Sequence, residues 1–298
     1  MAEMTGGGPL EIEKAAELGF CTGVRRAIDL LERAAREIGP VETLGPVVHN
    51  QQVIERLALS GIRVIESLDQ VQGNILAVSC HGVSPQVLEK IESRGLQMVD
   101  TTCPFVRRAQ LTARRLADAG FSVVIFGDQS HPEVQGVLGW AGGKGLATLS
   151  VPRFDWAPQR IGILSQTTQS FSAFANFIAE LIKSSLSHLS ELCIVNTICD
   201  ATRKRQQAAL ELAKRVDLML VVGGRNSANT HRLAEICSAA GVETYQIETA
   251  AEIKPGWLRN RNRLGVTAGT STPDQSIAEV AAKLKQLARY KGGNHGAK

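Results

Sequence analysis

Three cysteines are the residues whose type and spacing point most directly to chemistry. Each begins a similar phrase, and the phrases are Cys21-Thr22-Gly23-Val24-Arg25-Arg26-Ala27, Cys103-Pro104-Phe105-Val106-Arg107-Arg108-Ala109 and Cys199-Asp200-Ala201-Thr202-Arg203-Lys204-Arg205. Their recurrence at intervals of roughly ninety residues indicates an internal triplication of the chain. Three thiolates brought to one place repel one another and favour a bound cation. We therefore predict a metal or iron–sulfur centre held by Cys21, Cys103 and Cys199.

Polar side chains recur at two further sets of turns. In the first set, a glycine is followed four residues later by His49, His131 or Ser227, and two places further on by Gln51, Glu133 or Asn229. The second set carries His81, then Thr167 or Thr168, then Thr270 or Ser271. Such hydroxyls, amides and imidazoles, placed at helix N-termini, are suited to a phosphate-type anion. We expect each repeat to direct one cysteine and two polar turns at a common centre.

The elements that must position these groups alternate between strand and helix, which predicts an α/β fold with parallel sheets. Ligands of such sheets bind beyond the carboxyl ends of the strands, where the cysteines and polar turns lie. The expected strands are 10–12, 41–44, 75–79, 98–102, 122–126, 162–164, 194–198, 218–222 and 264–267. The expected helices include 27–38, 51–59, 85–93, 106–119 and 202–215, and the last helix ends near residue 290.

Composition narrows the class of protein. The chain has 298 residues, 44% hydrophobic and 21% charged, which fits a globular protein with an aliphatic core. A net charge of +4 is too small to indicate binding to nucleic acid or to a membrane surface. Six cysteines in a chain of this length do not indicate a secreted disulfide scaffold. We see no signal peptide and no apolar run long enough to span a membrane, so we expect a cytoplasmic protein.

The number of ligands bears on the kind of metal centre. Structural zinc usually has four protein ligands, often in close Cys-x-x-Cys pairs, and the chain has no such pair. A three-thiolate catalytic zinc site is conceivable. A cubane iron–sulfur cluster normally takes four cysteines. With three, one iron is left open to bind a substrate.

Simpler structural roles compete with these assignments. Glu133 lies in the first turn of a helix, where a carboxylate is favourable anyway, and Ser227, Asn229 and Ser271 are typical helix-capping residues. We expect the basic residues after each cysteine to be charges on helix faces rather than substrate clamps. We also expect Cys193 and Cys237 to lie in the core.

At this point the motifs resemble those of the LytB family of 4-hydroxy-3-methylbut-2-enyl diphosphate reductases. The matching phrases occur in the family's order from residue 19 to about residue 275, and they are Gly19-Phe20-Cys21-Thr22-Gly23-Val24, Val48-His49-Asn50, His81-Gly82-Val83-Ser84-Pro85, Thr102-Cys103-Pro104, His131-Pro132-Glu133-Val134, Gln166-Thr167-Thr168, Ile198-Cys199, Asn226-Ser227 with Asn229, and Thr267-Ala268-Gly269 with Ser271. One such motif is weak, whereas all of them in order are specific.

The resemblance implies three similar α/β domains in a trefoil-like arrangement around a central 4Fe–4S cluster, with one iron not ligated by cysteine. The expected domains are 10–101, 102–197 and 198–290, with a flexible tail at 291–298. The implied reaction is the two-electron reduction of an allylic alcohol diphosphate to isopentenyl and dimethylallyl diphosphate, with loss of water. It is the last step of the non-mevalonate isoprenoid pathway. An external donor such as ferredoxin or flavodoxin is implied.

The resemblance also implies roles for individual residues. Glu133 would supply protons, relayed with Thr167 to the substrate hydroxyl. The diphosphate would be held by the polar residues of the turns, namely His49, His81, His131, Thr168, Asn226, Ser227, Asn229 and Ser271.

The sequence departs from the family pattern at a few positions. Ala228 stands where the family usually has a second serine, and Asp200 stands where an aromatic residue is common. Asp128 and Ser130 alter a turn that usually reads histidine and glycine. Cys80 replaces a small residue before His81. Cys80 is either a fourth thiolate near the cluster or a buried small hydrophobe, and we favour the second because its side chain should point away from that of His81.

Two other functions compete with the reductase. One is an iron–sulfur hydro-lyase, in which an open iron adds or removes water without net reduction. The other is a non-catalytic iron–sulfur or zinc protein that senses redox state or carries a cluster.

Overall fold

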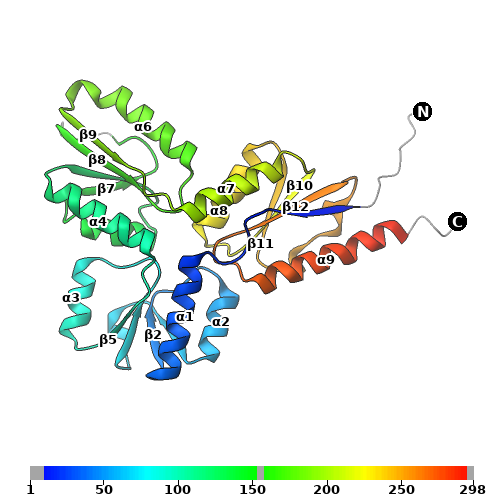
Figure 1. The fold of residues 1–298 in the computed structure, drawn as a ribbon, viewed down its shortest axis with the longest axis horizontal. Helices are drawn as coiled ribbons and strands as arrows, with labels where there is room; N and C mark the ends of the chain where they lie inside the picture. Colours follow the sequence, from blue (N-terminus) through cyan, green and yellow to red (C-terminus); the bar gives the residue numbers. More distant parts are fainter. Residues whose placement is uncertain (1–9, 153–157, 294–298) are drawn as a thin grey trace. The chain divides into compact units, whose positions relative to one another are not determined.

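The computed structural model describes residues 10–152 and 158–293 (Figure 1). The expected leader, 1–9, and the end of the expected tail, 294–298, lie outside the described residues. Three four-stranded parallel sheets are present within this part of the chain, with strand orders β5-β4-β2-β3, β9-β8-β6-β7 and β1-β12-β10-β11. This confirms the α/β fold class.

The strands are short and lie at regular intervals along the chain. Their bounds are β1 Glu11–Lys14, β2 Val41–Leu44, β3 Ile62–Ile65, β4 Ile75–Val78, β5 Gln97–Asp100, β6 Ser122–Phe126, β7 Gly145–Thr148, β8 Arg160–Ser165, β9 Glu191–Val195, β10 Leu218–Val222, β11 Glu243–Ile247 and β12 Arg263–Ala268. The helices between them are α1 Thr22–Glu37, α2 Gln51–Leu59, α3 Pro85–Ser93, α4 Pro104–Asp118, α5 Pro132–Trp140, α6 Phe171–Ser185, α7 Asp200–Ala213, α8 Ala228–Ala239 and α9 Asp274–Gly293. Helix α9 thus includes the first three residues of the expected tail.

All three sheets follow one plan. The strand that precedes each cysteine pairs in parallel with a second strand, and a polar turn follows that second strand. The third sheet obtains its cysteine strand from the start of the chain, because β1 pairs with β12 in the register Glu11↔Arg263. The first strand of the chain therefore completes the last sheet. The expected domain boundaries remain predictions.

The chain divides into two compact units. One unit contains residues 22–48 and 52–202 and holds the first two sheets, and the other contains 1–21, 49–51 and 203–298 and holds the third. Strand residues alternate between two buried faces, and the inner strands β4, β6 and β10 are accordingly almost wholly apolar. In the third sheet, α7 and α8 cover Met219 and Val221, whereas α9 covers Leu218, Leu220 and Val222. In the second, α4 and α5 cover one face and α6 covers the other.

Two strands end earlier than the sequence pattern predicted. We expected strands over 98–102 and 194–198, but β5 ends at Asp100 and β9 ends at Val195. The side chain of Asp100 accepts a hydrogen bond from the backbone N–H of Thr102 at 2.9 Å, and that of Asn196 accepts from Ile198 at 3.0 Å. An Asx turn of this kind replaces the strand ladder. Each turn lies three residues before a cysteine, so it ends the strand where the cysteine loop begins.

Candidate functional site

The three cysteines predicted as metal ligands occupy equivalent positions. Each lies directly before a helix, at the start of α1, α4 or α7. The backbone N–H of each donates to the carbonyl oxygen of the second residue after the neighbouring strand, and these bonds are Cys21 to Thr270 (3.1 Å), Cys103 to Cys80 (3.0 Å) and Cys199 to Thr167 (3.0 Å). This threefold repetition supports the predicted triplication, and it connects every cysteine to one polar turn. All six cysteines of the chain are free thiols.

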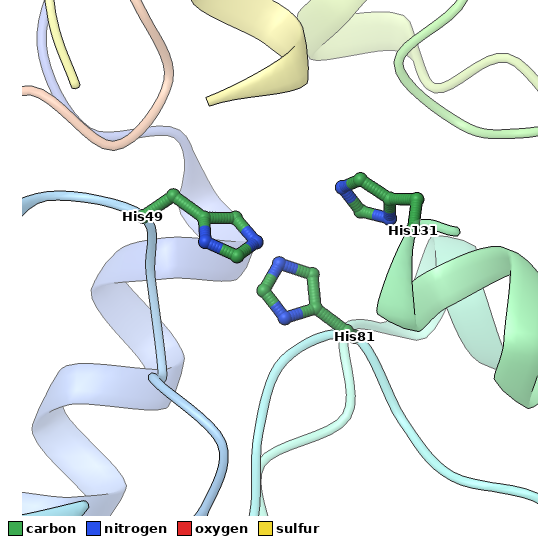
Figure 2. A group of neighbouring side chains, drawn as sticks. All are labelled: His49, His81 and His131. Carbon is green, nitrogen blue, oxygen red and sulfur yellow. The ribbon is translucent and has the colours of Figure 1, made fainter. Parts of the chain in front are cut away.

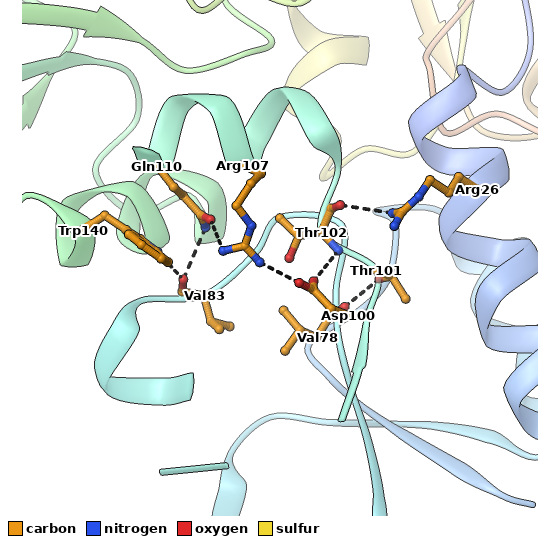
Figure 3. Close-up of polar contacts among 9 residues, drawn as sticks. All are labelled: Arg26, Val78, Val83, Asp100, Thr101, Thr102, Arg107, Gln110 and Trp140. Atoms are coloured by element: carbon orange, nitrogen blue, oxygen red, sulfur yellow. Dashed lines mark hydrogen bonds and ion pairs between the residues drawn. The ribbon is translucent and has the colours of Figure 1, made fainter. Parts of the chain in front are cut away.

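A hydrogen-bond network fixes the loop before Cys103 (Figure 3). The Thr101 hydroxyl donates to the carbonyl of Val78 at 2.6 Å. The carboxylate of Asp100 accepts from the guanidinium of Arg107 at 2.6 Å, and Arg26 donates to the carbonyl of Thr102 at 3.2 Å. The pKa of Asp100 is lowered: burial raises it, but bonds from Thr102 and the charge of Arg107 outweigh burial. Asp100 is therefore a stable anion that orients this loop.

The loops around the other two cysteines are held by different groups. The thiol of Cys199 lies 3.0 Å from the hydroxyl of Thr202, and the backbone N–H of Thr202 donates to the same sulfur at 3.3 Å. These two contacts hold the Cys199 side chain at the N-terminus of α7. Near Cys21, the buried guanidinium of Arg205 donates to the carbonyls of Gly19 (2.8 Å) and Ala268 (3.1 Å).

Arg205 corrects one expectation. We expected the basic residues after each cysteine to be charges on helix faces, and Arg25, Arg108 and Arg203 are exposed. Arg205 is 3% exposed and instead joins the loop before Cys21 to the end of β12. The sequence gives no local signal for this contact, because its partners lie far away along the chain.

Glu133 and Thr167 form a buried pair. Glu133 lies in the first turn of α5, where the imidazole of His131 caps the helix by accepting from the Glu133 N–H at 3.1 Å. The Glu133 carboxyl accepts from the Thr167 N–H at 2.6 Å and from the Thr167 hydroxyl at 2.9 Å. Only 2% of Glu133 is exposed. Burial raises the pKa of Glu133 to about 7, although both bonds from Thr167 act to lower it. The carboxyl can therefore hold a proton near neutral pH, as a general acid requires.

Two of the three predicted histidines, His81 and His131, lie against each other (Figure 2). Their rings meet edge to face, with centroids 5.4 Å apart. Burial lowers the pKa of His49, so its imidazole is largely neutral at pH 7 and offers an N–H rather than a full charge. Such a group can hydrogen-bond an anion, and in the neutral state it can also ligate a cation.

Several of the predicted binding residues are buried with unused hydrogen-bonding capacity. Asn229 is 3% exposed and Ser271 is 6% exposed. Within the part of the chain that the structure describes, neither the amide of Asn229 nor the hydroxyls of Ser271 and Thr168 have a hydrogen-bond partner. An unpaired buried polar group costs about 1–3 kcal/mol. Such groups at the carboxyl ends of strands therefore indicate a ligand site.

The remaining predicted binding residues, Ser227 and Asn226, differ in burial and in hydrogen bonding. Ser227 caps α8 and accepts from the Thr230 N–H at 3.4 Å, so its hydroxyl has a structural role as well. Asn226 is exposed. The buried hydroxyls of Thr230 and Thr267 also lack partners within the described residues, and neither residue was predicted to bind a ligand. Their positions in the sequence could have indicated them, because Thr230 follows Asn229 and Thr267 lies at the end of β12.

The other cysteines are placed as follows. Cys80 is buried, and its thiol donates to the carbonyl of Val47 at 2.8 Å. Cys237 is fully buried, and burial raises its pKa to about 12, so it is an unreactive core thiol. Cys193 is partly buried against the same core as α4 and α5.

The chain is similar to proteins of a known family. A family model described as "LytB protein" matches residues 12–285. A relative from Dehalococcoides mccartyi, named 4-hydroxy-3-methylbut-2-enyl diphosphate reductase, is 52% identical over 281 residues, which cover 93% of this chain and 99% of the relative. A relative of the same name from Geobacter metallireducens is 43% identical and covers 93% and 98%.

Solved structures agree with these relatives. The structure of the E-1-hydroxy-2-methyl-but-2-enyl-4-diphosphate reductase from Plasmodium falciparum has a TM-score of 0.88 and 26% identity, and the match covers 93% of this chain and 89% of that one. A second structure, of (E)-4-hydroxy-3-methyl-but-2-enyl diphosphate reductase, has a TM-score of 0.67 and 36% identity. The repeated cysteine turns, the family model and the relatives all indicate the same assignment, and this chain belongs to the LytB family.

Proposed function

We propose that the chain reduces 4-hydroxy-3-methylbut-2-enyl diphosphate to isopentenyl and dimethylallyl diphosphate, the last step of the non-mevalonate pathway. The balanced reaction takes two electrons and two protons, breaks the bond between carbon and the hydroxyl oxygen, and releases one water. The observation that carries the proposal is the chain of contacts from Glu133 through Thr167 to the backbone of Cys199. It connects a proton donor to a proposed metal ligand.

The donor set fits an iron–sulfur cluster with three cysteine ligands. Cys21, Cys103 and Cys199 are free thiols at equivalent turns, and each is partly exposed rather than sealed in the core. Cys80 is the candidate for a fourth ligand, but its hydrogen bond to Val47 favours a structural role. Three thiolates would thus hold a 4Fe–4S cluster with one iron not ligated by cysteine. When bound, the cluster supplies electrons to the substrate and a Lewis-acid site for its hydroxyl oxygen.

The chain's own residues would manage the protons. At pH 7 about half of the Glu133 carboxyl is protonated, because its pKa is raised to about 7. The Thr167 hydroxyl contacts Glu133 directly and can both accept and donate a hydrogen bond by rotating. We infer that Glu133 gives its proton by way of Thr167 to the departing hydroxyl, which leaves as water.

We propose that the polar turns bind the diphosphate. Within the described residues the side-chain groups of Thr168, Asn229 and Ser271 lack partners and can supply hydrogen bonds, and the ring nitrogens of the histidines can do the same. Asn229 also lies in the first turn of α8, where the helix dipole favours an anion. The diphosphate would satisfy buried groups that otherwise destabilise the fold, so binding and the loss of this penalty are coupled.

The reaction consumes electrons that must reach the cluster from outside, and we propose a ferredoxin or flavodoxin as the donor. We also propose the cytoplasm as the compartment, since six free thiols suit a reducing environment. In the described residues, no helix combines the length and apolar character needed to cross a membrane.

An anaerobic assay tests the proposed function. Cluster-loaded protein is mixed with the allylic diphosphate and a reduced dye, and dye oxidation is followed together with product formation. The proposal predicts two equivalents of one-electron dye oxidised per product, and a Glu133→Gln variant that keeps its cluster but loses most turnover. Conversion of the diphosphate without dye oxidation would contradict the proposal and indicate a hydro-lyase.

A further inference from the structure

A basic groove borders two of the three cysteine segments. It lies along α4 in the unit formed by residues 22–48 and 52–202, and we call it the α4 groove. Its lining residues are Pro104, Arg107, Arg108, Leu111, Thr112, Arg115 and Val195. Three of the seven are arginines, and none of the lining residues is acidic. The groove therefore presents positive charge on a concave surface.

The exposed residues of the groove form one stripe on α4. Arg108, Leu111 and Arg115 are three and four residues apart, a spacing that places side chains on the same helix face. Both Arg108 and Arg115 are exposed, and Leu111 between them is 51% exposed. An apolar side chain flanked by two arginines is a typical centre for a protein interface, where arginine is enriched and the rim is polar.

Arg107 differs from the other two arginines. Its guanidinium pairs with Asp100, bonds to Gln110 and lies 5.5 Å from the ring of Trp140 (Figure 3). Arg107 is thus engaged in holding the Cys103 loop. The charges available to a partner at this groove are those of Arg108 and Arg115.

The groove is close to the proposed metal ligands along the chain. The lining residue Pro104 directly follows Cys103. Arg108 lies five residues beyond Cys103, which corresponds to about 8 Å along a helix axis. Val195, another lining residue, is the last residue of β9, whose loop leads to Cys199. A partner seated here would contact the segments that carry both Cys103 and Cys199.

We propose that the α4 groove is the docking surface for an acidic electron-carrier protein of the ferredoxin kind. This inference rests on the proposed function, because only a reductive reaction needs such a carrier. Each turnover would oxidise two one-electron carriers in turn, and the two electrons would pass to the cluster and then to the substrate with two protons. Acidic charge on the carrier would complement Arg108 and Arg115 and steer the encounter.

The test compares two sources of electrons with the same cluster-loaded enzyme. The variant is Arg108→Glu with Arg115→Glu, assayed at low salt with a reduced acidic bacterial ferredoxin and, separately, with a reduced dye. The matched control reverses two exposed charges on α9, Lys285→Glu with Arg289→Glu, and so changes the net charge equally. A milder variant, Arg108→Gln with Arg115→Gln, serves if charge reversal reduces the yield of folded protein.

We expect the KM for reduced ferredoxin to rise about tenfold or more in the α4 variant and the salt dependence of the rate to weaken. The dye-driven rate should stay within about twofold of wild type, since a small dye does not need the steering that the groove charges provide. An unchanged KM for ferredoxin, an equal loss in the α9 control, or a parallel loss of the dye-driven rate would each overturn the docking proposal. Absence of dye-driven turnover in the wild type would instead refute the proposed function.

Discussion

Replacement of Glu133 by glutamine should change how stability depends on pH. Glu133 has a raised pKa in the folded protein, about 7 against an ordinary value of 4.5, because it is buried. A carboxyl of this kind contributes stability that is fully present below its unfolded pKa and is lost as pH rises through its folded pKa. Wild-type protein should therefore lose stability between about pH 4.5 and pH 7 on account of this one group.

The size of the effect follows from the two pKa values. Each pH unit of difference is worth about 1.4 kcal/mol, so the rise from 4.5 to about 7 corresponds to about 3 kcal/mol. Glutamine does not ionise, and it can keep hydrogen bonds to Thr167 that resemble those of the protonated carboxyl. Relative to wild type, the Glu133→Gln variant should gain about 3 kcal/mol in free energy of unfolding between pH 4 and pH 8.

Urea unfolding followed by circular dichroism at several pH values measures this difference. A Glu42→Gln variant is the matched control. Burial raises the pKa of Glu42, but Arg63 and the N–H groups of Gly73 and Gln72 outweigh burial and lower it. That variant should therefore lose stability relative to wild type as pH rises. A Glu133→Gln difference that stays constant from pH 4 to pH 8 would refute the raised pKa and with it the reason for choosing Glu133 as the acid.

Three other substitutions test two contacts of the proposed site and one packing contact outside it. Thr167→Val removes the hydroxyl bond that lowers the pKa of Glu133, so the basic limb of the pH–rate profile should move to higher pH while turnover falls. A limb at the same pH as in wild type would contradict the pairing of Glu133 with Thr167. Asn229→Leu should leave the free energy of unfolding unchanged or raise it by about 1–2 kcal/mol, because it removes an unpaired buried amide. It should also weaken diphosphate binding in calorimetry about tenfold, and unchanged affinity would exclude Asn229 from the pocket. Gly139→Ala adds a methyl group that clashes with the Ser84 side chain, and it should lower the free energy of unfolding in urea by about 1–3 kcal/mol. Adding Ser84→Gly should recover part of that stability, and no recovery would contradict the clash.

The alternation of strands and helices was visible in the sequence because inner strands such as β4, β6 and β10 are buried on both faces and therefore read as apolar runs. Leu218–Val222 and Ser122–Phe126 were predicted with the bounds that the structure has. The edge strands β3, β7 and β11 were not predicted. Half-exposed residues, such as those of Glu243–Ile247, give no apolar run, and edge strands depend on pairing with a neighbour.

The positions of the site residues followed from topology, since the carboxyl ends of parallel strands lie at one edge of a sheet. Their energetic states did not. The raised pKa of Glu133 requires knowing that its helix turn is buried against Thr167, which is 34 residues away in the chain. The contact of Arg205 with Gly19 joins residues 186 apart, and β1 joins the sheet of β12. Local patterns carry no information on such long-range pairings.

We propose that Cys21, Cys103 and Cys199 together hold one iron–sulfur cluster. The most direct measurement is the iron and sulfide content of anaerobically purified protein in which each of the six cysteines is replaced singly by serine. We predict that replacing Cys21, Cys103 or Cys199 lowers the content sharply, whereas replacing Cys80, Cys193 or Cys237 leaves it at the wild-type level. Full cluster content in any of the first three variants, or its loss in the Cys80→Ser variant, would contradict the assignment of the ligands.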